Sequence, residues 1–264
     1  MIAMTIVDTN LVLRLQDLNG DAWLEFWDVF GSSIERMVDS IARRCFSQET
    51  VQDIRQETLL QVFAEIGKFD VRRGVKFSTW VYAIARHIVS AEMAHRNAQK
   101  RGGGVKPVSL NDLALEDARE ATPEADFEKQ VFRAKVYRAL KLVEKRSEFL
   151  EFQVFKMKVT PPHGPSGAAA GGRPVKSQDI ALVLGISEAS VSRYLRRVRE
   201  RLREVLRDVV REYSFTEEEV DDIRRYRLDA SDDIFDAALG DICATVEEDR
   251  RRCHRVEKPA ATMP

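Results

Sequence analysis

The sequence has 264 residues, of which 44% are hydrophobic and 32% charged, so it is long enough for one large or two small globular domains. The formal net charge of −1 at first argues against a nucleic-acid partner. The three cysteines form no CxxC pair, which favours a reducing compartment, and no apolar run of membrane-spanning length occurs. We therefore expect a cytoplasmic protein with no membrane insertion, no metal site and no cofactor.

The net charge is misleading because positive and negative residues are segregated along the chain. Residues 173–211 contain ten Arg or Lys against five Asp or Glu, whereas residues 212–249 contain three Arg against fourteen Asp or Glu. This asymmetry is typical of a basic binding module beside an acidic tail.

In chain order, apolar residues at helical spacing predict packed helices over residues 21–100. Residues 102–126 include glycines and prolines, which predicts a flexible linker. Helical periodicity resumes at Phe127, is interrupted by a Gly- and Pro-rich loop at 160–174, and returns over 177–211. The acidic extension from 212 to 264 contains a capping box at Thr216 and short helical patterns. No strand pattern persists, so the fold class is all-α.

Residues 177–206, "SQDIALVLGISEASVSRYLRRVRERLREVL", have the pattern of a helix-turn-helix. Gly185 provides the turn between a short helix and a second helix, where a positive φ is easily adopted. The second helix carries one buried apolar stripe and an opposite face of Ser and Arg, which suits the major groove. The alternative is an Arg-rich solvated helix in any bundle. The residues that we expect to contact DNA here are Ser187, Ser190, Ser192, Arg193, Arg196 and Arg197.

An earlier stretch, "FDVRRGVKFSTWVYAIARHIV" at 69–89, combines basic side chains with aromatic rings at the start of an otherwise apolar helix. With the preceding "VQDIRQETLLQVFAEIGK", it resembles region 2 of the extracytoplasmic-function group of sigma-70 family sigma factors. Residues 177–206 resemble region 4 of the same family, in the same chain order. The resemblance implies a region 2 bundle over 1–101, the linker at 102–126, a region 4 domain over 127–211, and an extension at 212–264 beyond the family's usual end.

The resemblance implies an alternative sigma factor, which is not an enzyme. It would bind bacterial core RNA polymerase through the β′ clamp and β flap and direct it to promoter DNA. Asp53, Gln56 and Glu57 match the clamp-binding patch, and the alternative is that they are solvated surface. An exposed ring can replace the stacking that a flipped base loses when the −10 element melts. The −10 residues implied are Arg72, Arg73, Lys76, Phe77, Thr79, Trp80, Tyr82, Arg86 and His87.

For Trp80 and Phe77, the helical stripe favours a core position over contact with DNA. The chain also departs from the family pattern, since Gln52 replaces a common carboxylate and His87 a common Asn. Phosphorylation by a Ser/Thr kinase at Ser47, Thr50 or Thr58 would add negative charge near Gln52.

Two questions of role remain open from the sequence. The acidic extension could mask the helix-turn-helix, bind another protein such as an anti-sigma factor, or remain solvated. A stand-alone helix-turn-helix regulator is the alternative reading of the whole chain, and a protein that sequesters a basic partner is a third.

Overall fold

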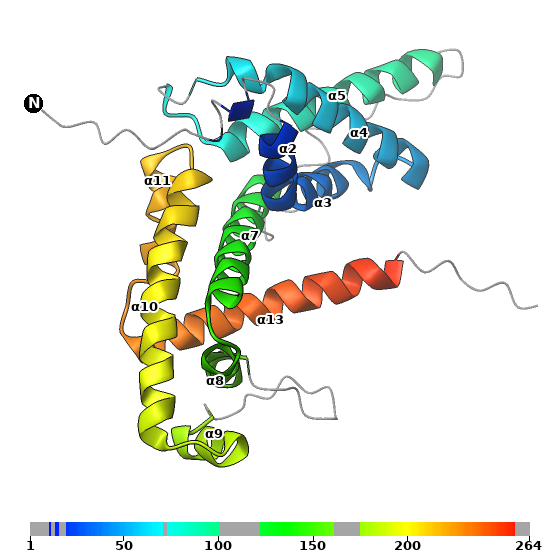
Figure 1. Cartoon of the computed structure of the whole chain (residues 1–264). Helices are drawn as coiled ribbons and strands as arrows, with labels where there is room; N and C mark the ends of the chain where they lie inside the picture. Colours follow the sequence, from blue (N-terminus) through cyan, green and yellow to red (C-terminus); the bar gives the residue numbers. More distant parts are fainter. Residues whose placement is uncertain are drawn as a thin grey trace, which may run out of the picture. The chain divides into compact units, whose positions relative to one another are not determined.

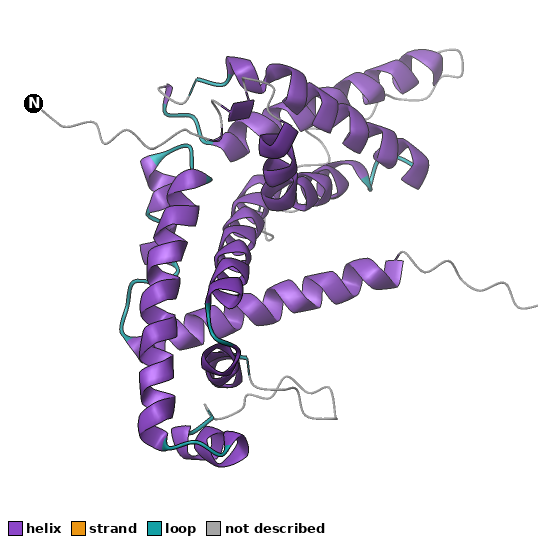
Figure 2. Cartoon of the chain, in the orientation of Figure 1, coloured by secondary structure: helices purple, strands orange, loops and turns teal. Residues whose placement is uncertain are grey.

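The computed structural model describes residues 11, 14–15, 20–70, 73–100, 122–160 and 175–256. Within these ranges the chain consists of helices and connecting loops and contains no strand (Figure 2), in agreement with an all-α fold. The chain forms two compact units, residues 1–132 with 212–219 and residues 133–211 with 220–264.

In the first unit, three helices, α3, α4 and α5, pack against one another pairwise (Figure 1). The predicted apolar stripes face this core, since Ile34 and Val38 of α3 and Val51 and Ile54 of α4 are all buried. Burial of these stripes, more than intrinsic propensity, stabilises such helices in water. The elements are α2 (Gly20–Phe26), a π-helical turn (Trp27–Gly31), α3 (Ser32–Ala42), α4 (Gln48–Glu65), a 3-10 turn (Ile66–Lys68) and α5 (Phe77–Lys100).

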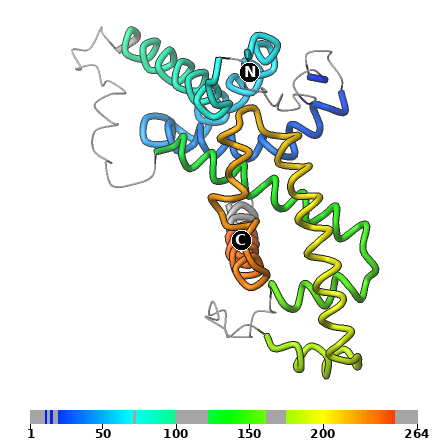
Figure 3. The backbone as a smooth tube through the Cα atoms, turned by 90° about the vertical axis from the view of Figure 1, so that its left-hand side faces the viewer, coloured from blue at the N-terminus to red at the C-terminus, as the bar shows by residue number. Residues whose placement is uncertain are grey.

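In the second unit, α8 packs against both α9 and α13. The contact with α13 is close at Gly240, where an added Cβ would lie 2.9 Å from the carbonyl oxygen of Val159. The chain turns sharply between α9 and α10 (Figure 3). The elements after residue 122 are α7 (Pro123–Arg146), which passes from the first unit into the second, α8 (Phe149–Val159), α9 (Ser177–Leu184), α10 (Glu188–Glu212), α11 (Glu217–Val220), α12 (Asp222–Arg225) and α13 (Asp232–Val256).

Helix α7 begins at Pro123, earlier than the start predicted from the periodicity at Phe127. Proline is well suited to the first helical position because its missing N–H would have no partner there. Thr122 precedes it, and its hydroxyl accepts a hydrogen bond from the backbone N–H of Ala125 at 3.2 Å. The predicted linker therefore ends by residue 122, and its residues 102–121 lie outside the described part of the chain, as do 161–174 of the predicted loop.

The acidic extension is not one uniform tail. Residues 212–219 belong to the first unit, whereas α13 belongs to the second. The buried side chains of α13 include Phe235, Asp236, Leu239 and Ile242. The predicted boundary at residue 212 coincides with a change from the second unit to the first, and a further change inside the extension follows residue 219, where the chain returns to the second unit.

Candidate nucleic-acid interface

The acidic face of α4 is exposed as predicted. Asp53, Gln56 and Glu57 all lie on the surface, and helical geometry places them on one side of α4. The same side carries Leu60, whose side chain is 69% exposed. Leu60 was not predicted as a site residue, although helical spacing could identify it, because a helix that buries Val62 cannot also bury a residue on its opposite side. Acidic groups around an exposed leucine form a surface suited to binding another protein.

Of the two aromatic rings at the start of α5, Phe77 belongs to the core and Trp80 lies at its edge. Phe77 is 1% exposed, and its ring centroid lies 5.1 Å from that of Phe30 and 5.7 Å from that of Phe69. Trp80 is half-buried and lies 5.2 Å from Phe69. Phe77 therefore does not offer a face for a flipped base in this structure, in contrast to its place among the candidate DNA-binding residues.

Four other candidate DNA-binding residues lie together on the solvent side of α5. Thr79, Arg86 and His87 are exposed and Tyr82 is half-buried, at positions that share one side of the helix. Arg73 lies before the helix, 80% exposed, with only a loose ion pair of 3.8 Å to Asp70. Arg72 lies outside the described residues. This side of α5 therefore combines positive charge and a partly exposed ring.

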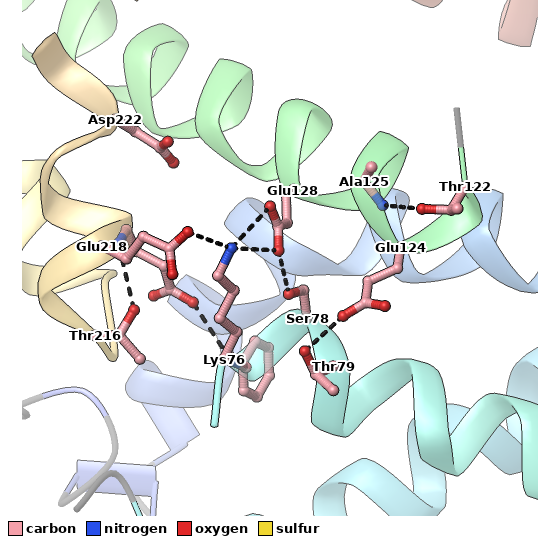
Figure 4. A network of polar contacts seen from close by, with 12 residues as sticks. Lys76, Ser78, Thr79, Thr122, Glu124, Ala125, Glu128, Thr216, Glu218 and Asp222 are labelled. Carbon is pink, nitrogen blue, oxygen red and sulfur yellow. Dashed lines mark hydrogen bonds and ion pairs between the residues drawn. The ribbon is translucent and has the colours of Figure 1, made fainter. Parts of the chain in front are cut away.

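Lys76, by contrast, is held in a network of carboxylates (Figure 4). Its ammonium group lies 2.9 Å from Glu218 and 3.3 Å from Glu128. The hydrogen bond to Glu218 and the charge of Glu128 raise the pKa of Lys76, although burial lowers it. Two hydroxyls at the start of α5 donate to α7 in the same network, Ser78 to Glu128 at 2.8 Å and Thr79 to Glu124 at 2.5 Å. None of these acidic partners was predicted, because they come from distant parts of the sequence.

The turn between α9 and α10 in the second unit has the predicted geometry. Gly185 adopts φ of 64°, in the left-handed region that favours glycine, and ends α9. The hydroxyl of Ser187 accepts the N–H of Ser190 at 3.2 Å, which caps the start of α10. Val191 and Leu195 of the apolar stripe are buried. Local sequence alone is enough to specify this turn and this cap.

The polar face of α10 is accessible. Ser192, Arg193 and Arg196 are exposed, whereas Ser190 is half-buried and accepts a hydrogen bond from Arg193 at 3.1 Å. Arg197 is 59% exposed and also forms an ion pair of 3.0 Å with Glu151 of α8. Guanidinium groups presented in this way can bind phosphates or base edges.

Helix α13 contacts a different side of α10. Arg199 pairs with Asp236 at 2.5 Å and with Asp232 at 2.9 Å, and Arg203 pairs with the other oxygen of Asp232 at 2.9 Å. The guanidinium of Arg203 also lies 4.5 Å from the ring centroid of Phe235. Acidic residues of the extension do fold onto the basic helix, but Arg193 and Arg196 remain exposed beside them. In the described residues, α13 supports α10 without covering the face of α10 that is predicted to bind DNA.

The three candidate phosphorylation sites differ in accessibility. Ser47 is exposed, and Thr50 is half-buried and accepts a hydrogen bond from Arg96 at 2.5 Å. Thr58 is completely buried and donates to the carbonyl oxygen of Ile54 at 2.7 Å. Its burial contradicts the expectation that a kinase reaches Thr58 in the folded chain.

Comparison with known families finds a match in the first unit. Residues 32–98, which span α3, α4 and most of α5, match the family described as sigma-70 region 2. This match supports a sigma factor of the sigma-70 family, with a role in promoter-specific transcription initiation. No curated protein matches the chain. None of the helices in the described ranges has the length and apolar character needed to cross a bilayer.

Proposed function

We propose that the chain is an alternative sigma factor of the extracytoplasmic-function group, which acts in the cytoplasm with bacterial core RNA polymerase. The observation that carries the proposal is the order of two surfaces along one chain. A sigma-70 region 2 match at residues 32–98 is followed by a helix-turn-helix whose second helix presents exposed arginines. A stand-alone regulator would need the second surface and would have no use for the first.

In this proposal, the acidic face of α4 binds the β′ clamp. Asp53 and Glu57 supply the charge, and the exposed Leu60 supplies apolar contact area. The helix-turn-helix anchors the polymerase at the −35 element through Ser187, Ser190, Ser192, Arg193, Arg196 and Arg197. The solvent side of α5, with Arg73 and Lys76 before it, binds the −10 strand. The partly exposed ring of Trp80 or Tyr82 is then the candidate to stack on a base.

Thr50 provides a candidate point of control by a Ser/Thr kinase. Its hydroxyl already contacts Arg96, so a phosphate at this position has a guanidinium partner within reach. It would also add negative charge to the first turn of α4, where the helix dipole favours it. Full activity of unmodified recombinant protein, unchanged by a phosphate on Thr50, would exclude this control.

The test of the function is in vitro transcription with the full chain, bacterial core RNA polymerase and a library of genomic fragments. We expect start sites that core enzyme alone does not use. Arg193→Ala should reduce transcription from those promoters about tenfold, because a specific arginine contact is worth about 1–3 kcal/mol. Arg207→Ala is the matched control, since Arg207 is also exposed on α10 but lies beyond the helix-turn-helix.

Polymerase binding is tested separately by Asp53→Lys, which reverses one charge on the exposed face of α4. Glu65→Lys makes the same charge change on the same helix, about 120° around it from Asp53. Only Asp53→Lys should weaken association with core enzyme. Tight binding of the chain alone to a symmetric duplex site, with no effect of core enzyme, would establish the stand-alone regulator instead.

A further inference from the structure

Residues 212–219, here called the connecting segment, lie in the first unit, although the preceding residues of α10 and the following helices α12 and α13 lie in the second. The segment reads "EYSFTEEE" and follows directly from the second helix of the helix-turn-helix. Its position in the first unit is at the start of α5, where Lys76 and Phe77 lead into the proposed −10 surface.

The segment is anchored by two aromatic residues. Phe215 is 2% exposed, and its ring centroid lies 4.5 Å from that of Phe77 and 5.7 Å from that of Phe69. Tyr213 is fully buried and donates its hydroxyl hydrogen to Glu25 of α2 at 3.3 Å. Side chains this deeply buried identify a specific contact with the first unit.

Two glutamates of the segment then bind the Lys76 ammonium and a backbone N–H at the start of α5 (Figure 4). Glu218 pairs with the ammonium of Lys76 at 2.9 Å. One carboxylate oxygen of Glu219 accepts the backbone N–H of Phe77 at 3.4 Å, and the other accepts the N–H of Phe215 at 2.6 Å. A lysine ammonium and a backbone N–H at a helix start are donors that bind a phosphate group equally well.

The carboxylates therefore stand where phosphates of a DNA strand would bind. We propose that the connecting segment is an intramolecular competitor of the −10 strand, which covers Lys76 and the start of α5 until DNA displaces it. This inference rests on the proposed function of that surface. The connecting segment would regulate promoter opening and not −35 binding, because α13 leaves the exposed arginines of α10 accessible.

The experiment compares two single substitutions at neighbouring positions, Glu218→Lys and Glu217→Lys. Both replace an exposed glutamate of the segment and make the same change in charge, but only Glu218 pairs with Lys76. Each full-length variant is assembled with bacterial core RNA polymerase. The affinity for a fluorescein-labelled pool of random single-stranded DNA is then measured. A second measurement follows hydrogen exchange of residues 73–79 in the free chain.

We expect the Glu218→Lys holoenzyme to bind the DNA pool about five- to tenfold more tightly than the Glu217→Lys holoenzyme, because repulsion from Lys76 raises the fraction with an open surface. Exchange over residues 73–79 should also be faster in Glu218→Lys. Equal affinities of the two variants overturn the inference, whether or not exchange changes. If no holoenzyme, wild type included, binds the pool better than core enzyme alone, the proposed function fails and the inference fails with it.

Discussion

The ion pair between Arg199 and Asp236 should contribute strongly to the free energy that holds α13 on α10. Both side chains are nearly buried, with 9% and 8% of their surfaces exposed. The pair is bidentate, with Nε to Oδ1 at 3.0 Å and Nη2 to Oδ2 at 2.5 Å. Burial lowers the pKa of Arg199, but the hydrogen bond and charge of Asp236 outweigh it, and the pKa is raised. The guanidinium of arginine is not deprotonated in proteins, so Arg199 stays charged when Asp236 is removed.

Asp236→Ala leaves a buried guanidinium without its main partner. Breaking a buried pair on one side costs about 3–5 kcal/mol. We expect the lower end, about 3 kcal/mol, because the half-exposed Asp232 still lies 2.9 Å from Nη1 of Arg199. Replacing both partners, as Arg199→Met with Asp236→Leu, should recover most of the loss because no charge is then buried.

The assay is urea denaturation of the full chain followed by circular dichroism, with hydrogen exchange of α13 to assign the transition. Asp233→Ala is the control, since Asp233 is exposed in the same turn, and it should change the free energy of unfolding by less than about 0.5 kcal/mol. The reasoning is refuted if Asp236→Ala is as stable as Asp233→Ala.

Two further predictions concern α13. Gly240→Ala should lower the free energy of unfolding by about 1–2 kcal/mol, because its Cβ would meet the carbonyl oxygen of Val159 at 2.9 Å; a more stable variant in urea denaturation would show that helix propensity outweighs this clash. Burial, with the charge of Glu247, raises the pKa of Cys243 to about 12. Iodoacetamide at pH 8 should therefore alkylate Cys243 far more slowly than an unfolded thiol, with the rate rising as pH approaches 12. Peptide mapping by mass spectrometry measures this rate, and alkylation at the rate of the urea-unfolded chain would contradict it.

The turn between α9 and α10 shows how much local sequence can determine. Gly185 ends α9 because a positive φ is needed there, and Ser187 caps α10 with a side chain three residues from its donor. The spacing of Val191 and Leu195 specifies which side of α10 is buried. Each of these features depends on groups within one or two helical turns, so a sequence pattern predicts it.

The first unit shows which features helical periodicity does not predict. Periodicity favours burial of Phe77, but only packing decides that the polar Thr58 is buried as well. The contact of Phe77 with Glu219 joins residues 142 positions apart. Helical spacing predicts an apolar or acidic face but not the segment that packs against it. Which segment packs there depends on shape and charge across the whole fold. The amino-acid order thus determined the helices and their caps, whereas tertiary packing alone decided that an acidic segment contacts Lys76 and the start of α5.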